Sequence, residues 1–409
     1  MGSHNQSMVS KWFKILFYML VFIESHVNGQ NADLNATFIT DAIAKGAVCL
    51  DGTPGAYYFA KGFGDGINSW MIYLPGGGWC NSKEVCLNRS STDLGSNKNV
   101  PTKALTTFQS QNKTINPDFY NWNFVEILYC DGASFMADVE AVNPETKLHL
   151  RGRRIFTSVI EELMSTQGMS NAENALLVGN SAGGLATILN CDRFHSFLPG
   201  ACRIKCISDS GFFILAEHLR GGQDNAIYKF RKIVLFHELA DFLPKSCTQR
   251  LDPELCFFPE NVVNDIWTPL FMLNSDFDRF QVSTLVLPNS TNEVGWRDCT
   301  KNNTSNLPSC TQNNSNLPFC TDNQQQLIMD FQTTFLKTLE KLDDNPSRGL
   351  FITSCYAHDF IPYLSNWQRT PSLQNKTIRQ VVGDWYFERS RVQFIDTQNL
   401  YPINCDVTV

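Results

Sequence analysis

The sequence predicts an α/β fold in which a mostly parallel central sheet carries helices on both faces. Short apolar runs alternate with longer segments of helical periodicity along the 409 residues, which is the pattern of β-α-β units. Hydrophobic residues make up 43% of the chain and charged residues 18%. This composition suits a globular protein with a sizeable core and argues against a disordered one.

Six apolar runs bounded by turn residues are expected to be strands of this sheet. They cover residues 69–79, 122–132, 174–181, 202–211, 268–278 and 349–359. A helix is predicted over 150–167, where Ile155, Val159 and Leu163 recur on one helical face. Another helix is predicted directly after the third strand, over 182–198.

The first 29 residues are predicted to be a signal peptide. Lys11 and Lys14 precede an apolar run over 15–23 that is too short to span a bilayer, and a small residue, Gly29, follows. An uncleaved membrane anchor is the alternative. We expect a secreted, extracellular protein whose mature part, 30–409, is one domain that makes no contact with a membrane after cleavage.

The cysteines agree with export. All 14 follow the signal peptide and their number is even, which is typical of disulfides formed in an oxidising compartment. No C-x-x-C pair occurs, and the tightest spacing is that of Cys202 and Cys206. Zinc sites favour tight ligand pairs, so we predict neither a metal nor another cofactor.

The charge of the chain limits its partners. The net charge is −7 and no basic run occurs, so nucleic-acid binding is not expected. An acidic protein also gains no long-range attraction towards a polyanion. Any acidic polymer that the protein uses must therefore be held by a local basic patch.

One stretch, at about residues 285–326, is rich in Asn, Thr, Ser and Gln. It contains the near-repeats NLPSCTQN (306–313) and NLPFCTDN (316–323). Because such a stretch has little to bury, we expect an exposed insertion within the domain. A role in substrate binding is the alternative, since long loops often carry function.

The string GNSAGG (179–184) places Ser181 between an apolar strand and a helix. Gly179 and Gly183 complete the G-x-S-x-G pattern of a nucleophile elbow, in which the serine lies on a strained bend and the glycines allow helix and strand to approach. A plain turn of small residues is the alternative. The flanking strand and helix favour the nucleophile.

A serine nucleophile needs a base, usually a histidine oriented by a carboxylate, and α/β-hydrolases carry them in the order Ser, acid, His. Of the seven histidines, only His358 follows every plausible acid, just beyond the sixth strand. The acid is expected after the strand at 268–278, which offers Asp276 and Asp278, whereas Asp209 is a less usual position. Spacing alone does not choose between Asp276 and Asp278.

Three consecutive glycines, 76–78, end the first predicted strand. Bare backbone there can direct its N–H groups towards a developing negative charge, and the Ala182 N–H would complete the set. A tight glycine turn that closes the strand is the alternative.

Together these motifs resemble the plant-type pectin acetylesterase family, which also includes the Notum-type carboxylesterases that remove palmitoleate from Wnt proteins. The resemblance extends from about residue 46 to 387. It rests on unusual strings in a fixed order: GGGWCN (76–81), YCDGASF (129–135), LRGRRI (150–155), NSAGGLAT (180–187), DSGFF (209–213), CFFPE (256–260) and SCYAHD (354–359). It implies a disulfide-braced α/β-hydrolase-like fold that acts without a metal.

The resemblance also selects the acid. Family members carry an aromatic-Asp pair shortly before a Gln, and FDRFQ (277–281) places Asp278 in that role. The implied catalytic triad is Ser181, Asp278 and His358. The implied oxyanion donors are the backbone N–H groups of Gly77, Gly78 and Ala182.

The function implied is that of a secreted serine carboxylesterase of the cell wall. It would hydrolyse O-acetyl esters of pectin through an acyl-enzyme and release acetate. Two departures bear on the substrate: Pro75 replaces a Glu common in plant members, and Asn180 replaces a Cys. The alternatives are a Notum-like hydrolase of a lipid (palmitoleoyl) ester and an inactive extracellular glycan-binding protein. The sequence makes no prediction of the oligomeric state.

Overall fold

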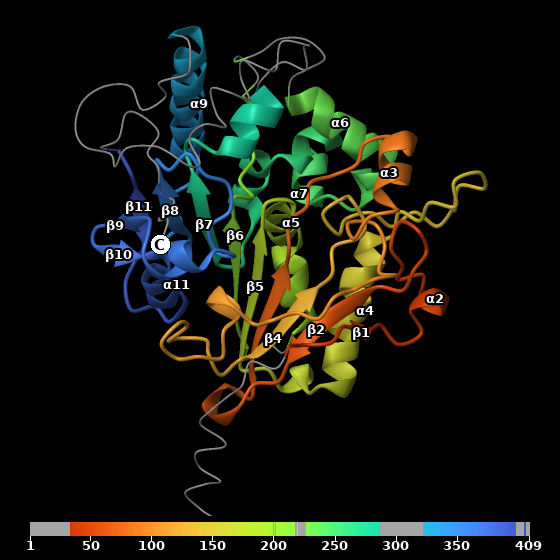
Figure 1. The fold of residues 1–409 in the computed structure, drawn as a ribbon. Helices are drawn as coiled ribbons and strands as arrows, with labels where there is room; N and C mark the ends of the chain where they lie inside the picture. Colours follow the sequence, from red (N-terminus) through yellow and green to blue (C-terminus); the bar gives the residue numbers. More distant parts are fainter. Residues whose placement is uncertain are drawn as a thin grey trace, which may run out of the picture.

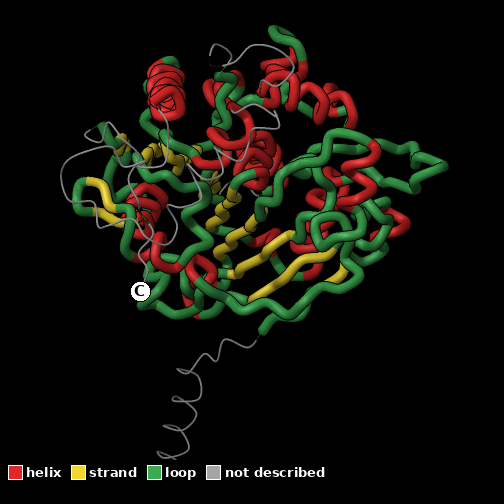
Figure 2. The backbone as a smooth tube through the Cα atoms, turned by 45° about the horizontal axis from the view of Figure 1, so that its top comes forward, coloured by secondary structure: helices red, strands yellow, loops and turns green. Residues whose placement is uncertain are grey.

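A computed structural model describes residues 33–198, 200, 202–216, 219, 226–286, 322–397 and 405. The predicted signal peptide and most of the predicted insertion, 287–321, lie outside the described residues. The described ends of that insertion are helical: Gln281–Val286 forms a π-helix, and helix α9 begins at Asp322. A nine-stranded sheet crosses the molecule (Figures 1 and 2).

All six predicted strands are present. They are β3 (Ser69–Leu74), β4 (Asn123–Ile127), β5 (Asn174–Asn180), β6 (Arg203–Asp209), β7 (Leu270–Ser275) and β8 (Gly349–Thr353). Three strands of the nine-stranded sheet were not predicted: β1 (Thr37–Phe38), β2 (Ala56–Ala60) and β11 (Gln393–Ile395). Two of them are only two or three residues long, so neither could show the period-two pattern of a strand.

The order of the strands is β1-β2-β4-β3-β5-β6-β7-β8-β11. The pairs from β4–β3 through to β8–β11 are parallel, and only β1–β2 and β2–β4 are antiparallel. The predicted α/β fold with a mostly parallel sheet is therefore confirmed. The carboxyl ends of β5, β7 and β8 lie along one edge of this sheet, because these strands run in the same direction.

Both faces of the sheet are buried. In β3, Trp70 and Ile72 belong to one hydrophobic cluster, and Met71 and Tyr73 belong to the other. The first face is covered by four helices: α4 (Gly152–Thr166), α5 (Ala182–Phe197), α6 (Ala226–Phe236) and α9 (Asp322–Glu340). The second face is covered by α10 (Leu364–Gln368) and α11 (Ile378–Tyr386). Helices α4 and α5 confirm the two predicted helices. Crossover helices on both faces are what a parallel sheet requires.

Shorter elements complete the fold. They are α2 (Ala42–Lys45), α3 (Lys83–Arg89), α7 (Lys245–Thr248) and the hairpin of β9 (Ser372–Leu373) with β10 (Lys376–Thr377). Helix α3 matters for the site described below, because it lies just beyond the glycine loop that follows β3.

The described residues contain five disulfides. They join Cys49 to Cys130, Cys80 to Cys86, Cys191 to Cys206, Cys247 to Cys256 and Cys355 to Cys405. Disulfide bracing is therefore confirmed, but Cys202 is free and buried. The tight Cys202 and Cys206 spacing is not a ligand pair, since Cys206 is bonded to Cys191 of α5.

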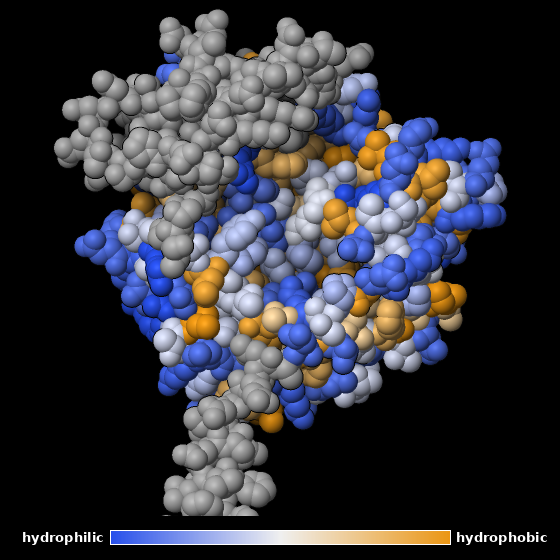
Figure 3. Space-filling model, in the orientation of Figure 1, coloured by the Kyte–Doolittle hydropathy of each residue, from blue (hydrophilic) through white to orange (hydrophobic). Residues whose placement is uncertain are grey.

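Within the described part of the chain, no helix combines the length and the apolar composition needed to cross a membrane. On the face shown in Figure 3, hydrophobic residues are scattered among hydrophilic ones. Among the large hydrophobic side chains, Ile43, Leu235 and Trp267 are each more than 60% exposed.

Candidate active site

Ser181 lies on a strained bend between β5 and α5. Its φ of 53° and ψ of −123° are values that residues with a side chain rarely adopt, at a cost of about 1–3 kcal/mol. Its backbone N–H donates a hydrogen bond of 2.8 Å to the carbonyl of Asp209 at the end of β6. The bend therefore presents the serine hydroxyl at the carboxyl edge of the parallel strands.

The glycines around Ser181 allow α5 to pass close to the sheet. A Cβ atom on Gly179 would lie 2.1 Å from the carbonyl oxygen of Gly183, and a Cβ on Gly183 would lie 1.9 Å from that of Leu74 in β3. Both obstacles are backbone atoms, which cannot rotate away. The spacing of the G-x-S-x-G pattern is thus a requirement of helix packing.

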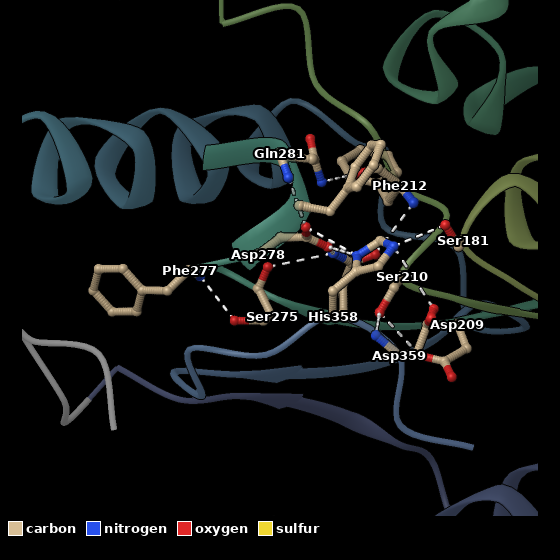
Figure 4. A network of polar contacts seen from close by, with 12 residues as sticks. Ser181, Asp209, Ser210, Phe212, Ser275, Phe277, Asp278, Gln281, His358 and Asp359 are labelled. Atoms are coloured by element: carbon tan, nitrogen blue, oxygen red, sulfur yellow. Dashed lines mark hydrogen bonds and ion pairs between the residues drawn. The ribbon is translucent and has the colours of Figure 1, made fainter. Parts of the chain in front are cut away.

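Three side chains that are distant in the sequence meet at this edge (Figure 4). The Nε2 atom of His358 lies 2.8 Å from Oγ of Ser181. Its Nδ1 atom lies 3.0 and 2.9 Å from the two carboxylate oxygens of Asp278. All three distances are those of hydrogen bonds, and a histidine between a serine and a carboxylate can accept the serine proton.

Asp278 is fully buried and is held by further donors. Its Oδ1 accepts a hydrogen bond of 2.9 Å from the backbone N–H of Gln281, and its Oδ2 accepts a longer one of 3.4 Å from the Asn274 amide. Asp276 faces a different group, since its carboxylate accepts from the Gln332 amide at 2.9 Å. Burial raises the pKa of Asp276 to about 8. The structure therefore places Asp278, and not Asp276, against the imidazole.

The surroundings of His358 favour its charged form. Burial by itself lowers the pKa of a histidine, but the charge and hydrogen bond of Asp278 outweigh this effect and raise the pKa of His358 to about 9. Asp359 contributes in the same direction, with a carboxylate oxygen 3.8 Å from Nε2. The aromatic ring of Phe280 stacks on the imidazole at a centroid distance of 5.0 Å. These surroundings would therefore stabilise an imidazolium at this position.

Asp209 holds the loop that carries the histidine. Its Oδ2 accepts hydrogen bonds of 2.8 Å from the backbone N–H groups of both Phe360 and Ile361. Burial and the neighbouring Asp359 raise the pKa of Asp209. By its position in the sequence, Asp209 is only a third candidate for the acid. The position of Asp209 at the carboxyl end of a central strand is the sequence feature that could have indicated that it supports the histidine loop.

The glycine loop after β3 runs directly beside the nucleophile. A Cβ atom on Gly76 would lie 2.7 Å from Cβ of Ser181. Asn180 holds the loop there, because its Oδ1 accepts hydrogen bonds from the Gly76 N–H at 2.9 Å and the Tyr73 hydroxyl at 2.5 Å. The departure at Asn180 therefore places an amide oxygen where it can hold this loop.

The carbonyl groups of Gly77 and Gly78 are both engaged. The Gly77 oxygen accepts a hydrogen bond of 2.8 Å from Arg89 of α3, and the Gly78 oxygen accepts one of 2.7 Å from the Tyr129 hydroxyl. The φ values, 148° at Gly77 and 64° at Gly78, are ones that glycine adopts at little cost. Sequence reasoning missed both supports: Arg89 stands in none of the quoted motifs, and Tyr129 begins the YCDGASF string without any signal of this contact.

The backbone donors of this region remain free. Among the described residues, none accepts a hydrogen bond from the N–H groups of Gly77, Gly78 or Ala182. Ala182 is the first residue of α5, where backbone N–H groups have no partner within the helix and the positive end of the helix dipole lies. These three groups can therefore bind an oxyanion.

One cluster has the composition of a metal site. Within the described ranges, Cys80, Cys86 and His237 are the group whose potential ligand atoms lie within 4.8 Å of one another. The two sulfurs form a disulfide, so neither is the thiolate that binds a metal. His237 lies 2.8 Å from the carbonyl oxygen of Cys80. In this oxidation state the donor set does not fit a metal.

Comparisons with known proteins agree with the resemblance. The pectinacetylesterase family model matches residues 27–408. The chain is 39% identical to pectin acetylesterase 11 of Arabidopsis thaliana over 401 residues, which is 97% of each chain. It is 40% identical to pectin acetylesterase 7 of the same plant over 364 residues, which is 88% of this chain and 89% of the relative. It is 30% identical to the palmitoleoyl-protein carboxylesterase notum1a of Danio rerio over 261 residues, which is 58% of this chain and 49% of that protein.

Proposed function

The chain belongs to the pectinacetylesterase family of carboxylic ester hydrolases, and from this premise we propose that it removes O-acetyl groups from cell-wall pectin and releases acetate. The observation that carries the proposal is the hydrogen-bonded series of Ser181, His358 and Asp278. We further propose that the protein acts outside the cell, as the apolar segment within residues 1–29 indicates.

In the proposed mechanism, Oγ of Ser181 attacks the carbonyl carbon of the acetyl ester while Nε2 of His358 accepts its proton. Asp278 keeps the other imidazole proton on Nδ1 and stabilises the imidazolium. The oxyanion is bound by the free backbone N–H groups of Gly77, Gly78 and Ala182. His358 then donates its proton to the departing sugar oxygen. Water attacks the acetyl-serine by the same route and acetate leaves.

Aromatic packing beside the nucleophile supports a small acyl group. The indole N–H of Trp79 donates a hydrogen bond of 2.7 Å to Oγ of Ser134, which in turn donates one of 2.7 Å to the carbonyl of Ala182. Trp79 also packs edge-on against Phe213 and Phe230, with both centroid distances at 5.2 Å. Rings held in this way fill volume next to the elbow that the chain of a lipid ester would need. We therefore propose acetyl over palmitoleoyl esters.

The test compares the wild-type protein with a Ser181→Ala variant and a matched Ser196→Ala variant. Ser196 is exposed on the same helix, and within the described part of the chain its hydroxyl donates a hydrogen bond to the Arg193 carbonyl alone. Acetylated pectin, acetylated xylan and a long-chain ester are the substrates, and released acid is measured. We expect acetate from pectin with the wild type and Ser196→Ala, and none with Ser181→Ala.

Retained acetate release by Ser181→Ala would remove Ser181 from the mechanism. Faster hydrolysis of the long-chain ester would favour the lipid alternative. A folded wild-type protein that resists labelling by a fluorophosphonate would favour an inactive glycan-binding protein.

A further inference from the structure

A second cavity lies beside α4 and α5, away from the triad. Its volume is about 210 Å³, and its walls include Arg153, Arg193, Asp192, Asp265, Phe242 and Ile266. The α5 residues in the wall come 7 to 12 positions after Ser181, which is roughly 10–18 Å along a helix that rises 1.5 Å per residue. The cavity is therefore separate from the proposed catalytic site.

Two arginines in this wall lack an acidic partner. The guanidinium of Arg153 lies over the ring of Phe242 at 5.2 Å, and within the described part of the chain its side chain forms no hydrogen bond or ion pair. Arg193 donates hydrogen bonds to the Thr157 hydroxyl and the Asn190 amide oxygen, and among the described residues it forms no ion pair. Its guanidinium also lies over the rings of Phe156 and Phe197, at 5.5 and 5.4 Å. The neighbouring Arg154 shows the contrast, because it pairs with two carboxylates.

The acids in the wall are engaged elsewhere. Asp192 accepts hydrogen bonds from the backbone N–H groups of Trp267 and Thr268, at 3.4 and 2.9 Å. Asp265 pairs with Arg250 at 2.5 Å. Among the described residues, neither acid forms an ion pair with Arg153 or Arg193, although Asp192 shares the cavity wall with both.

The electrostatics of the arginines agree with this geometry. Burial lowers the pKa of Arg153. Burial and the charge of Arg153 lower the pKa of Arg193 to about 10. Buried charges are normally paired, and a guanidinium binds a carboxylate through two parallel hydrogen bonds. An anion that enters the cavity would supply the missing partner.

An exposed aromatic side chain stands next to the cavity. Trp267 follows Ile266 of the wall, is 61% exposed, and contacts the His195 ring at a centroid distance of 4.3 Å with the two ring planes tilted by 52°. An exposed tryptophan offers an apolar face with a polar edge. Such a face suits the C–H groups of a sugar ring.

We infer that Arg153, Arg193 and Trp267 form a second binding site for a uronate unit of an anionic polysaccharide. The sugar carboxylate binds the guanidiniums and the sugar ring packs on the indole. The cavity is smaller than the roughly 300–1,000 Å³ of sites that enclose drug-sized ligands, so it holds one charged unit. The net charge of −7 gives no long-range attraction to a polyanion. The two arginines of this site would therefore bind the polyanion through local contacts.

The choice of pectin as the source of the uronate rests on the proposed function, but the site itself does not. Binding is therefore measured with an oligogalacturonate that carries no acetyl group, by calorimetry on the whole protein, with its neutral methyl ester as the second arm. The variants are Arg153→Gln and Trp267→Ala. The matched controls are Arg391→Gln and Phe63→Ala, which change exposed residues distant in the sequence from the cavity walls.

We expect Arg153→Gln and Trp267→Ala each to weaken binding of the oligogalacturonate about ten-fold or more. The controls should bind as the wild type does, and all variants should cleave a small soluble acetate ester at the wild-type rate. The Arg153 side chain has no polar partner among the described residues, and the variant loses only the contact of the guanidinium with the Phe242 ring. Its melting temperature should therefore stay close to that of the wild type.

Equal affinity of the variants and the wild type would overturn the site, and so would equal affinity for the methyl ester. A protein that binds the oligogalacturonate through these residues yet releases no acetate from pectin would refute the proposed function alone. A protein that releases acetate but binds without these residues would refute the site alone.

Discussion

Replacement of Asp278 by Asn tests whether this carboxylate fixes the tautomer of His358. The Asn side chain must place its NH₂ group at one of the two carboxylate oxygen positions. At the Oδ1 position the NH₂ would face the Gln281 N–H, which donates there at 2.9 Å. At the Oδ2 position it would face the Asn274 amide, whose present bond is longer at 3.4 Å. The second arrangement is expected, because it gives up the longer and therefore weaker of the two hydrogen bonds.

In that arrangement the new NH₂ group donates to Nδ1 of His358, which lies 2.9 Å from Oδ2. The imidazole proton must then move to Nε2, the atom that faces Ser181. A protonated Nε2 cannot accept the serine proton. Loss of the correct tautomer in a Ser-His-Asp enzyme lowers kcat about 10⁴-fold, which corresponds to about 5.4 kcal/mol at about 1.36 kcal/mol per factor of ten.

The chain provides a matched control in Asp276→Asn. Burial raises the pKa of Asp276 to about 8, so this acid is largely protonated at neutral pH and an amide imitates it closely. The assay is the hydrolysis of a soluble acetate ester at pH 7, together with the rate of fluorophosphonate labelling. We expect a loss of about four orders of magnitude in Asp278→Asn and a small change in Asp276→Asn. A loss below ten-fold in the first variant, or an equal loss in both, would refute the reasoning.

Three further predictions concern the same site. His358 must be neutral to accept a proton, and its pKa is raised to about 9, so kcat/KM should rise with pH through that region. Asp359→Asn should move the midpoint of this pH profile about one unit lower. An unmoved midpoint would contradict the role given to Asp359. Gly183→Ala should lower the free energy of unfolding, measured by urea titration, by about 3 kcal/mol or more, because the new Cβ would lie 1.9 Å from the Leu74 oxygen. A variant as stable as the wild type would show that α5 can shift away from β3. Trp79→Ala should increase the hydrolysis of longer acyl esters relative to acetate, and an unchanged chain-length profile would locate the acyl group elsewhere.

Much of the fold could be read from local pattern. Each of the six central strands is buried on both faces and therefore appears as a continuous apolar run. Residues 150–167 show one apolar face, and α4 forms there. The strands of the nine-stranded sheet that escaped prediction are β1, β2 and β11. The edge strands β1 and β11 are only two and three residues long and carry little periodicity of their own. Strand β2 lies between β1 and β4 and takes its place in the sheet from its pairing with them.

Local pattern was enough to name the residue types for the chemistry: one serine in an elbow pattern, one histidine late enough in the chain, and two acids two positions apart. Spacing did not choose between these acids. The family resemblance pointed to Asp278, and the structure brings Asp278 to the imidazole because the two carboxylates point to different groups on the turn after β7. The tertiary structure also revealed the supports, such as Asp209 under the histidine loop and Arg89 on the Gly77 carbonyl. Such contacts join segments that are distant in the sequence, and no local pattern records them.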